Sequence, residues 1–340
     1  MEKTCLLGLS KNRLTDEVTR LGLPRFTATQ ILDWLYKKRV EDISQMTNLS
    51  LKSRELLSEH FQVGREAPYQ EVRSVDGTAK YLFRTLSGGL VETVFIPDED
   101  RGTVCVSCQE GCKMNCLFCM TGKQGFKGNL TARDIVNQVL SLPETDRLTN
   151  LVFMGMGEPL DNLDAIFETI EVLTATWGLA WSPKRITIST CGLEKGIDRV
   201  LQGTQVHLAV SLHAAVAETR RHLMPAERAF PIEKVVERCL QADFSHQRRL
   251  SFEYIVFEGI NDSEASLKAL LKLLRPLDCR VNLIRFHKIP GVDLEGVSPE
   301  RMVEIRDYLT SHGLFTTIRA SRGEDIWAAC GMLSTKGKKA

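Results

Sequence analysis

The spacing of apolar residues changes twice along this chain and divides it into regions of different structure. In residues 1–65 the apolar positions recur every three or four residues, which is typical of amphipathic helices. We expect helices near 14–21 and 51–61, with another between them. The middle helix should begin at Thr27, because Thr27 and Gln30 have the spacing of a capping box. The pattern predicts a small N-terminal helical domain.

Residues 66–102 follow a second pattern, in which apolar and polar residues alternate. Alternation of this kind is typical of half-buried strands. Two such segments, 80–85 and 90–96, flank Ser87-Gly-Gly89, a sequence that favours a tight turn. We predict a β-hairpin extension over this region.

From residue 103 onward, short runs rich in β-branched residues alternate with amphipathic segments. The expected strands are 103–108, 150–154, 185–189, 206–213, 250–257, 280–286 and 315–318. The expected helices are 132–141, 163–173, 193–201, 232–242, 263–274 and 299–311. This order favours parallel strands joined by crossover helices. The chain is too short for an eight-fold barrel, so we predict an α/β fold with a partial (β/α)6 barrel over 103–320 and a C-terminal tail over 321–340. Ligands should bind at the carboxyl ends of the strands.

The composition is typical of a globular protein. Hydrophobic residues make up 43% of the 340, and no apolar run approaches the length of a membrane span. The first residues lack the apolar region and cleavage site of a signal peptide. We therefore expect a cytoplasmic location and no membrane contact.

The net charge is only +1, so binding to nucleic acid would need local basic patches. Each candidate patch is more often a solvated surface run than a binding site. The candidates are Lys37-Lys38-Arg39, Arg220-Arg221, Arg248-Arg249 and the tail lysines Lys336, Lys338 and Lys339.

Ten cysteines are many for a cytoplasmic protein of this length, and five lie between Cys105 and Cys119. Three of these, Cys112, Cys116 and Cys119, have the spacing Cys-x3-Cys-x2-Cys. Three thiolates are too few for a closed zinc site, but they suit a 4Fe–4S cluster in which one iron has no protein ligand. The alternative is a zinc knuckle completed by Cys108 or a histidine.

The other cysteines fall into two groups. Four behave as small core residues by their sequence context: Cys5, Cys191, Cys239 and Cys279. Cys330 differs, because it precedes Gly331 and a loose tail and could therefore reach a site.

Polar residues follow several predicted strands, at the edge where a ligand should bind. Met154-Gly-Met-Gly-Glu-Pro159 follows the second strand, where Gly157 would let the backbone approach a ligand and Glu158 could accept from an ammonium group. Ser189 ends the third strand, and Ser211-Leu-His213 ends the fourth. Each of these could equally be a satisfied polar residue at the barrel rim.

The cysteine motif, with Phe118 before its last cysteine, resembles that of the radical S-adenosylmethionine superfamily. A longer series of motifs, over about residues 10 to 333, resembles the RlmN/Cfr family of RNA adenine methyltransferases. The segments that carry the resemblance are Val91-Glu-Thr-Val-Phe-Ile-Pro97, Cys105-Val-Ser-Cys-Gln109, the cluster motif, Gly-Phe-Lys-Gly-Asn-Leu130, Met-Gly-Met-Gly-Glu-Pro159, Ile-Ser-Thr190, Ser-Leu-His213, Val-Asn-Leu-Ile284 and Ala-Ala-Cys-Gly331.

The resemblance implies one 4Fe–4S cluster per chain, S-adenosylmethionine as cofactor and a role for each matching residue. Cys112, Cys116 and Cys119 would bind the cluster. The cofactor contacts would be Gly157, Glu158, Ser189, Ser211, Leu212, His213 and His287. His287 stands where the family has an asparagine, and its imidazole could donate to an adenine or ribose in the same way. Cys108, where a serine is common in the family, has no assigned role.

In the reaction that the resemblance implies, one S-adenosylmethionine methylates Cys330, and a second yields a radical that takes hydrogen from the S-methyl group. The methylene radical then adds to adenine. Glu92 would accept a proton and Cys105 would release the adduct through a transient disulfide with Cys330, although either residue could take the carbon-bound proton. A thiolate is the nucleophile, so the cluster–cofactor complex or Arg322 could lower the thiol pKa.

The implied substrates are adenines in the peptidyl-transferase centre of 23S rRNA and next to the anticodon of tRNA. Electrons would come from a donor such as flavodoxin, and we expect a monomer. Ala320-Ser-Arg-Gly-Glu-Asp-Ile326 is more similar to the carbon-2 branch of the family than to the carbon-8, Cfr-type branch. Two alternatives stay open: a non-catalytic iron–sulfur protein that binds RNA, and a radical enzyme for a small molecule, which would leave the N-terminal helices unexplained.

Overall fold

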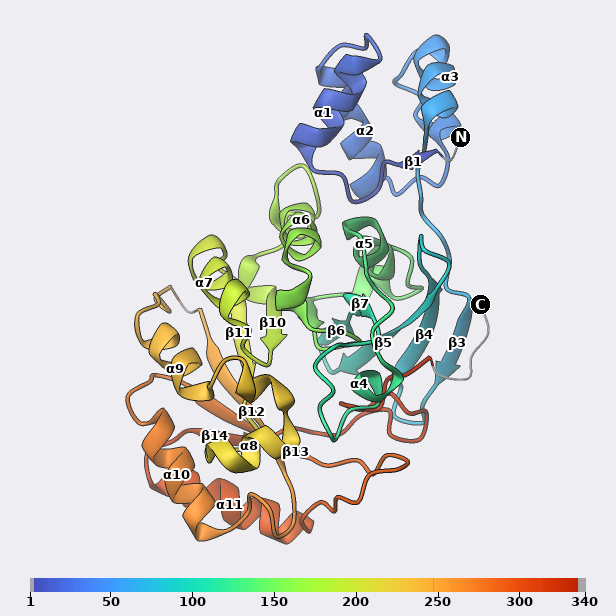
Figure 1. Cartoon of the computed structure of the whole chain (residues 1–340). Helices are drawn as coiled ribbons and strands as arrows, with labels where there is room; N and C mark the ends of the chain where they lie inside the picture. Colours follow the sequence, from blue (N-terminus) through green and yellow to red (C-terminus); the bar gives the residue numbers. More distant parts are fainter. Residues whose placement is uncertain (1–2, 247, 336–340) are drawn as a thin grey trace.

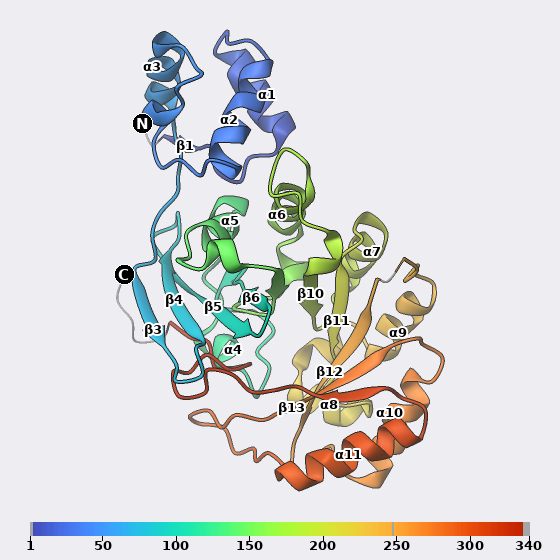
Figure 2. The same cartoon turned by 180° about the vertical axis from the view of Figure 1, so that it is seen from behind.

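The computed structural model describes residues 3–246 and 248–335. Lys336, Lys338 and Lys339 lie outside the described residues. The N-terminal region folds as the expected helical unit, with α1 (Lys11–Arg20), α2 (Phe26–Tyr36) and α3 (Leu51–His60). The short parallel strands β1 (Thr4–Cys5) and β2 (Phe61–Gln62) bring its two ends together. Its helices enclose a hydrophobic core that also includes Val136, Leu140 and Val172 from later in the chain, and Figures 1 and 2 show the unit at one end of the molecule.

The capping box predicted at Thr27 is wrong. α2 begins at Phe26, its N-cap is Arg25, and no side chain caps it. The Thr27 N–H donates to the carbonyl of Pro24 at 2.9 Å, so Thr27 already lies inside the first turn. Gln30 reaches forward and donates to the carbonyl of Asn48 at 3.3 Å. Contacts within the helical unit have overridden the local capping signal.

The rest of the chain forms one ten-stranded sheet with the order β14-β13-β12-β11-β10-β9-β6-β5-β4-β3. Seven strands run parallel, as the sequence predicts: β6 (Arg101–Cys105), β9 (Asn150–Phe153), β10 (Ile186–Thr190), β11 (His207–Ser211), β12 (Leu250–Val256), β13 (Arg280–Arg285) and β14 (Thr316–Ile318). β3 and β14 are its edges, so the barrel is open.

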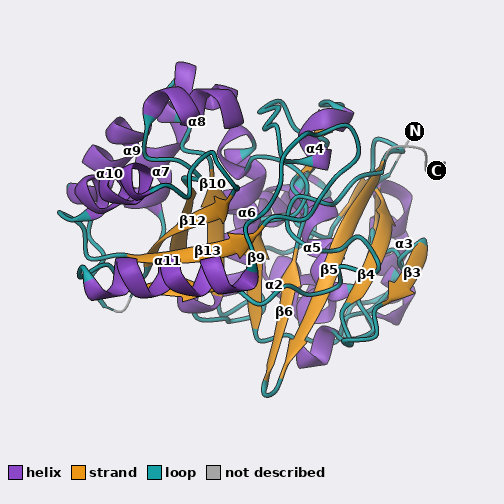
Figure 3. Ribbon diagram, turned by 90° about the horizontal axis from the view of Figure 1, so that it is seen from below, coloured by secondary structure: helices purple, strands orange, loops and turns teal. Residues whose placement is uncertain are grey.

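The predicted hairpin is confirmed as β4 (Ala79–Arg84) and β5 (Leu90–Asp98), and β3 (Gln70–Arg73) pairs outside it. It does not form a separate sheet. β5 pairs antiparallel with β6 from Val94↔Cys105 to Asp98↔Arg101, which joins the hairpin to the barrel. Figure 3 shows the turn between β5 and β6 projecting beyond the other strands.

Helices cover the outer face of the parallel strands, as Figures 1 and 2 show. The six expected ones are confirmed: α5 (Ala132–Leu140), α6 (Leu163–Thr174), α7 (Glu194–Gly203), α9 (Ile232–Leu240), α10 (Glu264–Leu274) and α11 (Pro299–Ser311). Two short helices, α4 (Met120–Gln124) and α8 (Ala217–Leu223), lie near the carboxyl ends of the strands. Within the described residues, no helix is long and apolar enough to cross a membrane.

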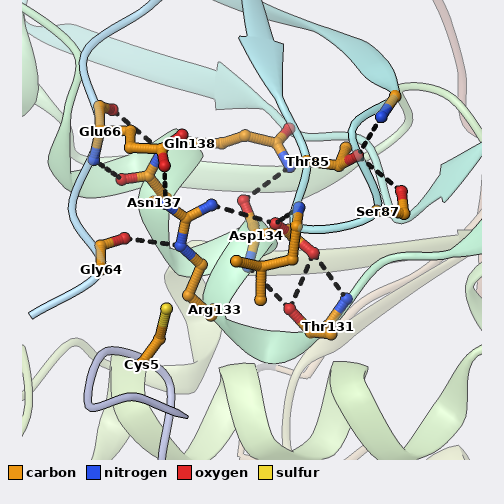
Figure 4. A network of polar contacts seen from close by, with 12 residues as sticks. Cys5, Gly64, Glu66, Thr85, Ser87, Thr131, Arg133, Asp134, Asn137 and Gln138 are labelled. Atoms are coloured by element: carbon orange, nitrogen blue, oxygen red, sulfur yellow. Dashed lines mark hydrogen bonds and ion pairs between the residues drawn. The ribbon is translucent and has the colours of Figure 1, made fainter. Parts of the chain in front are cut away.

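Helix α5 links the helical unit to the barrel through the polar contacts drawn in Figure 4, and all nine of its residues are buried. The Arg133 guanidinium donates to the carbonyl of Gly64, and Asn137 exchanges two hydrogen bonds with the backbone of Glu66. On another side of the same helix, Gln138 exchanges two hydrogen bonds with the backbone of Ser107. α5 therefore holds both the connection to the helical unit and the segment that leads to the cysteine motif.

Candidate active site

The cysteine motif occupies the loop between β7 (Gln109–Glu110) and α4. Gly111 is required at its start, because φ is +83° and a Cβ would lie 1.6 Å from the carbonyl oxygen of Gly125. The Leu117 N–H donates to the carbonyl of Leu223 at 2.9 Å and ties the loop to α8. Cys112, Cys116 and Cys119 all line one cavity, which we call the inner cavity. The structure therefore brings the three predicted cluster ligands together.

The donor set of the inner cavity fits an iron–sulfur cluster. Burial raises the pKa of Cys112 to about 12 and that of Cys116 well above its usual range, so these thiols need a metal to stay deprotonated. Cys108, the candidate fourth ligand of a zinc site, is buried and does not line the cavity. Among the described residues, no three His, Cys, Asp or Glu side chains lie close enough together to bind a single metal ion. A 4Fe–4S cluster is larger than one ion, and the three cysteines that line the cavity would be its ligands.

Gly157 and Glu158 line the same cavity. Gly157 has φ +107°, and a Cβ there would lie 2.6 Å from Cβ of Gln109. Glu158 is buried, and its carboxylate accepts from Thr190 Oγ1 at 2.6 Å, from the Leu160 N–H at 3.0 Å and from the Cys191 N–H at 2.9 Å. Burial raises the pKa of Glu158. A carboxylate can accept about four hydrogen bonds, so one acceptor position could serve a ligand ammonium.

Ser189, Ser211 and His213 also line the inner cavity, at the carboxyl ends of β10 and β11. His213 Nδ1 accepts from the Ile255 N–H at 3.0 Å. Burial and then the Arg220 charge lower the pKa of His213 to about 3. The ring is therefore neutral, with its proton on Nε2, which is free to donate to a ligand. Phe118 packs edge-on against the ring, with 4.7 Å between centroids.

Two of the predicted cofactor contacts lie elsewhere. Leu212 is buried in the core and does not line the inner cavity, and its N–H donates to the carbonyl of Glu253. His287 lines a second cavity, which we call the outer cavity, with Nε2 3.1 Å from Ser321 Oγ and Nδ1 3.3 Å from Glu324 Oε1. Burial lowers the pKa of His287. The outer cavity adjoins the inner one, because Ile284, Arg319 and Cys330 line both.

Arg220 supports the site from a buried position, although the sequence pattern suggests that it belongs to a basic surface patch. Its side chain is fully buried and forms an ion pair with Glu227. Nη2 donates to the carbonyls of Cys191 and Ser211, each at 3.0 Å, and Nε donates to that of Leu212. Arg220 therefore fixes the strand ends that carry the cavity. An arginine pair in the sequence gives no sign of this, because the partners are brought together only by the fold.

Residues of two further basic patches are also engaged within the protein. Arg248 is buried and donates to the carbonyls of Val200, Leu201 and Val206. In the first patch, Lys37 and Lys38 face Asp33, and Arg39 pairs with Asp146. Arg220 and Arg248 are thus excluded as surface contacts for RNA.

The tail brings Cys330 to the two cavities, and its side chain is exposed there. The Met120 N–H donates to the carbonyl of Gly331 at 2.8 Å, and Thr121 Oγ1 donates to that of Leu333 at 2.7 Å. These bonds dock the tail onto α4, directly after the last cysteine of the motif.

Cys105 is buried at the end of β6, beside Cys330. Burial, and then the charge of Cys330, raise the pKa of Cys105 to about 12. Arg319 lies next to both thiols: the charge of Cys330 is the main cause that raises the pKa of Arg319. Arg322, one of the cations that the sequence suggests near the thiol, lines the outer cavity with Cys330 and faces Asp98 at 3.9 Å.

Glu92 lies away from both cavities, in a buried ion pair with Lys80 at 3.2 Å. Glu92 Oε2 accepts from the Ser334 N–H at 2.9 Å, and Lys80 Nζ donates to the carbonyl of Trp327 at 3.0 Å. The pair therefore binds both ends of the segment 327–334, which carries Cys330.

Comparison with known proteins finds two family models. Residues 106–271 match the radical SAM superfamily, and residues 4–63 match the N-terminal domain of a ribosomal RNA large subunit methyltransferase. The chain is 61% identical to a probable dual-specificity RNA methyltransferase RlmN of Phocaeicola vulgatus, over 98% of this chain and 95% of that protein. It is 41% identical to a dual-specificity RNA methyltransferase RlmN of Desulfotalea psychrophila, over 98% and 96%.

One solved structure is similar over nearly the whole length of both chains. It is a radical SAM methyltransferase from Sphaerobacter thermophilus, with a TM-score of 0.91 and 40% identity, covering 97% of this chain and 99% of that one. The likeness extends from the helical unit through the partial barrel to the tail.

Proposed function

This chain belongs to the RlmN family of radical S-adenosylmethionine RNA methyltransferases, and we propose that it methylates carbon 2 of adenine in 23S rRNA and in tRNA. The observation that carries the proposal is the position of Cys330. It lies at the mouth of the cavity lined by Cys112, Cys116 and Cys119, with Arg319 at the same wall. A protein that only bound RNA would not need a thiol there.

The inner cavity is the proposed site of the cluster and of S-adenosylmethionine. Cys112, Cys116 and Cys119 hold one 4Fe–4S cluster per chain, which when bound supplies the electron that cleaves the cofactor and so yields a radical. Glu158 accepts from the cofactor ammonium, and Gly157, Ser189, Ser211 and His213 contact the rest of it. Leu212 contributes its backbone, between Ser211 and His213, to the cofactor site. The His287 side chain contacts the cofactor from the outer cavity.

Cys330 is the proposed methyl carrier. Its thiolate attacks the methyl group of one S-adenosylmethionine, so that a new S–CH₃ bond forms at Cys330 while the sulfonium bond breaks and its electron pair stays on the leaving sulfur. The Arg319 guanidinium lies beside the two thiols. The radical obtained from a second S-adenosylmethionine then takes a hydrogen atom from the S-methyl group. The methylene carbon bonds to carbon 2 of adenine and links Cys330 to the RNA. The adduct then gives up one electron, for which the iron–sulfur cluster would be the acceptor, and the hydrogen of carbon 2 leaves as a proton to a base.

Cys105 is the proposed resolving thiol. Its sulfur bonds to the sulfur of Cys330, the bond between Cys330 and the methylene carbon breaks, and that carbon takes a proton to become the new methyl group. An external reductant then restores both thiols. The Cys105 thiol is protonated at neutral pH because of its raised pKa, so a base is needed. Glu92 is that base only if the tail rearranges, because Glu92 does not line the cavities in this conformation.

The remaining parts of the proposal concern the setting of the reaction. The protein acts as a monomer in the cytoplasm, where rRNA and tRNA are found. A donor such as flavodoxin supplies the electrons. The target adenine must leave its stack to reach Cys330, as bases do in other enzymes that act on carbon atoms of a base.

The direct test is an anaerobic assay of reconstituted protein with S-adenosylmethionine, reductant and an rRNA fragment. We expect about four irons per chain and 2-methyladenosine in the digested product by mass spectrometry. 8-Methyladenosine instead would assign the protein to the carbon-8 branch. One tightly bound zinc and no iron would contradict the radical reaction.

Two variants test the thiols. Cys330→Ala should bind cluster and cofactor normally but yield no methylated RNA. Cys105→Ala should accumulate RNA covalently attached through Cys330, seen as a slow band on a denaturing gel that nuclease removes. Methylation by Cys330→Ala would contradict the whole reaction, and wild-type turnover by Cys105→Ala would remove the resolving role.

A further inference from the structure

The outer cavity is unusual in the number of guanidinium groups at its wall. It is lined by Arg101, Arg319 and Arg322, and by one carboxylate, that of Asp98. His287 adds no charge there, since its pKa is lowered by burial. The wall therefore carries a local excess of positive charge in a protein whose net charge is +1. No residue assigned above to the cofactor explains this excess.

Two of these arginines share a single acidic partner. Arg101 Nη2 lies 2.8 Å from Asp98 Oδ2, and Arg322 Nη2 lies 3.9 Å from Asp98 Oδ1. The two oxygens of one carboxylate thus each face one guanidinium. Within the described residues, Arg322 has this one ion pair and no hydrogen bond. Each guanidinium has five N–H donors, so most of their donors are available to another anion.

Of the other acids nearby, Glu99 and Asp100 lie in the same turn as Asp98 but form no ion pair with Arg101 or Arg322 within the described residues. Glu324, which precedes Asp325 in the tail, is engaged by Arg285 and by His287. Arg319 is partly offset by Glu253 at 3.7 Å, on the side of the inner cavity. Arg101 and Arg322 therefore form an anion site that Asp98 fills only in part.

The position of the outer cavity selects the anion. Cys330 and Arg319 line both cavities, so a molecule in the outer one lies next to the sulfur that is proposed to bond to the base. When a base turns out of its stack into an active site, its backbone phosphates stay outside. Arginine pairs bind phosphate oxygens in this forked geometry.

We propose that the outer cavity is a phosphate subsite, in which Arg101 and Arg322 bind a backbone phosphate next to the target adenosine and displace Asp98. This inference rests on the proposed action on RNA and adds to it the part of the substrate that fixes the register. Until RNA binds, Asp98 pairs with the two arginines and so keeps other anions from binding there. The site recognises backbone and not base, which suits an enzyme with two different RNA substrates.

The first experiment measures binding of reconstituted protein, without S-adenosylmethionine, to a fluorescent RNA hairpin that has an adenosine in its loop. Each phosphate contact contributes about 0.7–0.9 to the slope of log affinity against log salt. The double variant R101A/R322A should lower the slope by about that amount. D98N should bind several-fold more tightly at low salt. Arg306→Ala is the matched control, because Arg306 is an exposed arginine paired with Asp307 away from both cavities.

The second experiment identifies the phosphate. A neutral methylphosphonate replaces each linkage around the loop adenosine in turn. One linkage next to the adenosine should weaken binding of the wild-type protein several-fold and leave the affinity of R101A/R322A unchanged. Loss of affinity at distant linkages only, or equal loss in both proteins at every linkage, would overturn the subsite. Unaltered slopes for R101A/R322A and D98N would do the same.

The outcomes for the subsite and for the proposed function are distinct. RNA that binds with the predicted linkage effect but gains no methyl group would refute the proposed reaction and leave the subsite standing. Methylation with equal slopes for the double variant and Arg306→Ala would refute the subsite alone. R101K/R322K keeps both charges, so it should restore the slope, and it separates lost charge from a disturbed fold.

Discussion

Two buried ion pairs support the two halves of this site, and they do so in different ways. Arg220 and Glu227 are seven residues apart in the chain. Arg220 also donates hydrogen bonds to three carbonyls at the ends of β10 and β11. Lys80 and Glu92 lie on neighbouring strands, and each also binds the tail that carries Cys330. One pair fixes the strand ends that line the inner cavity, and the other holds a segment that would have to move in the proposed reaction.

The difference follows from the chemistry that each half performs. Cofactor binding needs residues in fixed positions. The strand ends are held by the Arg220 guanidinium, whose contacts lie within the barrel. In the proposed reaction, Cys330 must meet a sulfonium methyl, an adenine and Cys105 in turn. A tail held by single hydrogen bonds, from Lys80 and Glu92 at its ends and from Met120 and Thr121 between them, can change position without loss of the barrel. The predictions below test whether the two pairs differ in this way.

The largest effect is expected from Arg220→Met. It leaves Glu227 buried without its partner and removes three hydrogen bonds at the strand ends, which should lower the free energy of unfolding by about 3–5 kcal/mol. Chemical denaturation measures this. Arg221→Met is the control, because Arg221 is exposed and its loss should change stability by about 0.5 kcal/mol or less. Equal losses in the two variants would refute the structural role of Arg220.

Lys80→Met should have a smaller and more local effect. It removes a charged partner of Glu92 and the bond to Trp327, so the segment 327–334 should lose most of its protection from hydrogen exchange. The amides of β10 and β11 should exchange as in the wild type. The free energy of unfolding should fall by about 2–3 kcal/mol, at the lower end for a broken buried pair, because the tail can release. Lys234→Met, which removes an exposed partner of Glu237, is the control. Faster exchange across the whole barrel would contradict a local role.

The sequence predicts the regular part of this molecule well and the supporting contacts poorly. The six barrel helices follow from amphipathic spacing, since each helix packs on its own adjacent strand. The grouping of Cys112, Cys116 and Cys119 at one cavity follows from their spacing within one loop. The burial of Arg220 and Arg248 could not be predicted, because their partners are carbonyls that only the fold brings near. The motifs of His287 and Glu92 suggest a common site with the cluster motif. Their positions outside the inner cavity could not be predicted either, because these too are set only by the fold.

A pH effect follows from His213. Its pKa is about 3 in the folded protein and about 6.5 in the unfolded chain. Between these values only the unfolded chain takes up the proton, so stability falls as the pH drops below 6.5. From pH 7 to pH 5 the wild type should lose about 2 kcal/mol through this group. His213→Asn keeps an acceptor for the Ile255 N–H and tolerates the positive φ of 53°. Between the same two pH values, the free energy of unfolding of the variant, measured by chemical denaturation, should fall by about 2 kcal/mol less than that of the wild type. An unchanged difference would mean that His213 is not kept neutral by the fold.

The smallest effect is expected from Thr190→Val, which tests how closely the rigid half must be held. Thr190 Oγ1 donates to Glu158 and accepts from the Gly192 N–H at 2.9 Å, so the valine leaves one buried N–H unpaired and Glu158 with two of its three bonds. The cost in stability should be about 1 kcal/mol. If Glu158 binds the cofactor ammonium, its looser carboxylate should raise the dissociation constant of S-adenosylmethionine several-fold in calorimetry on the reconstituted protein. Thr190→Ser keeps the hydroxyl and should restore both values. A valine variant that loses stability but binds the cofactor as the wild type does would separate Thr190 from the cofactor site, and the rigidity of this half would then concern folding alone.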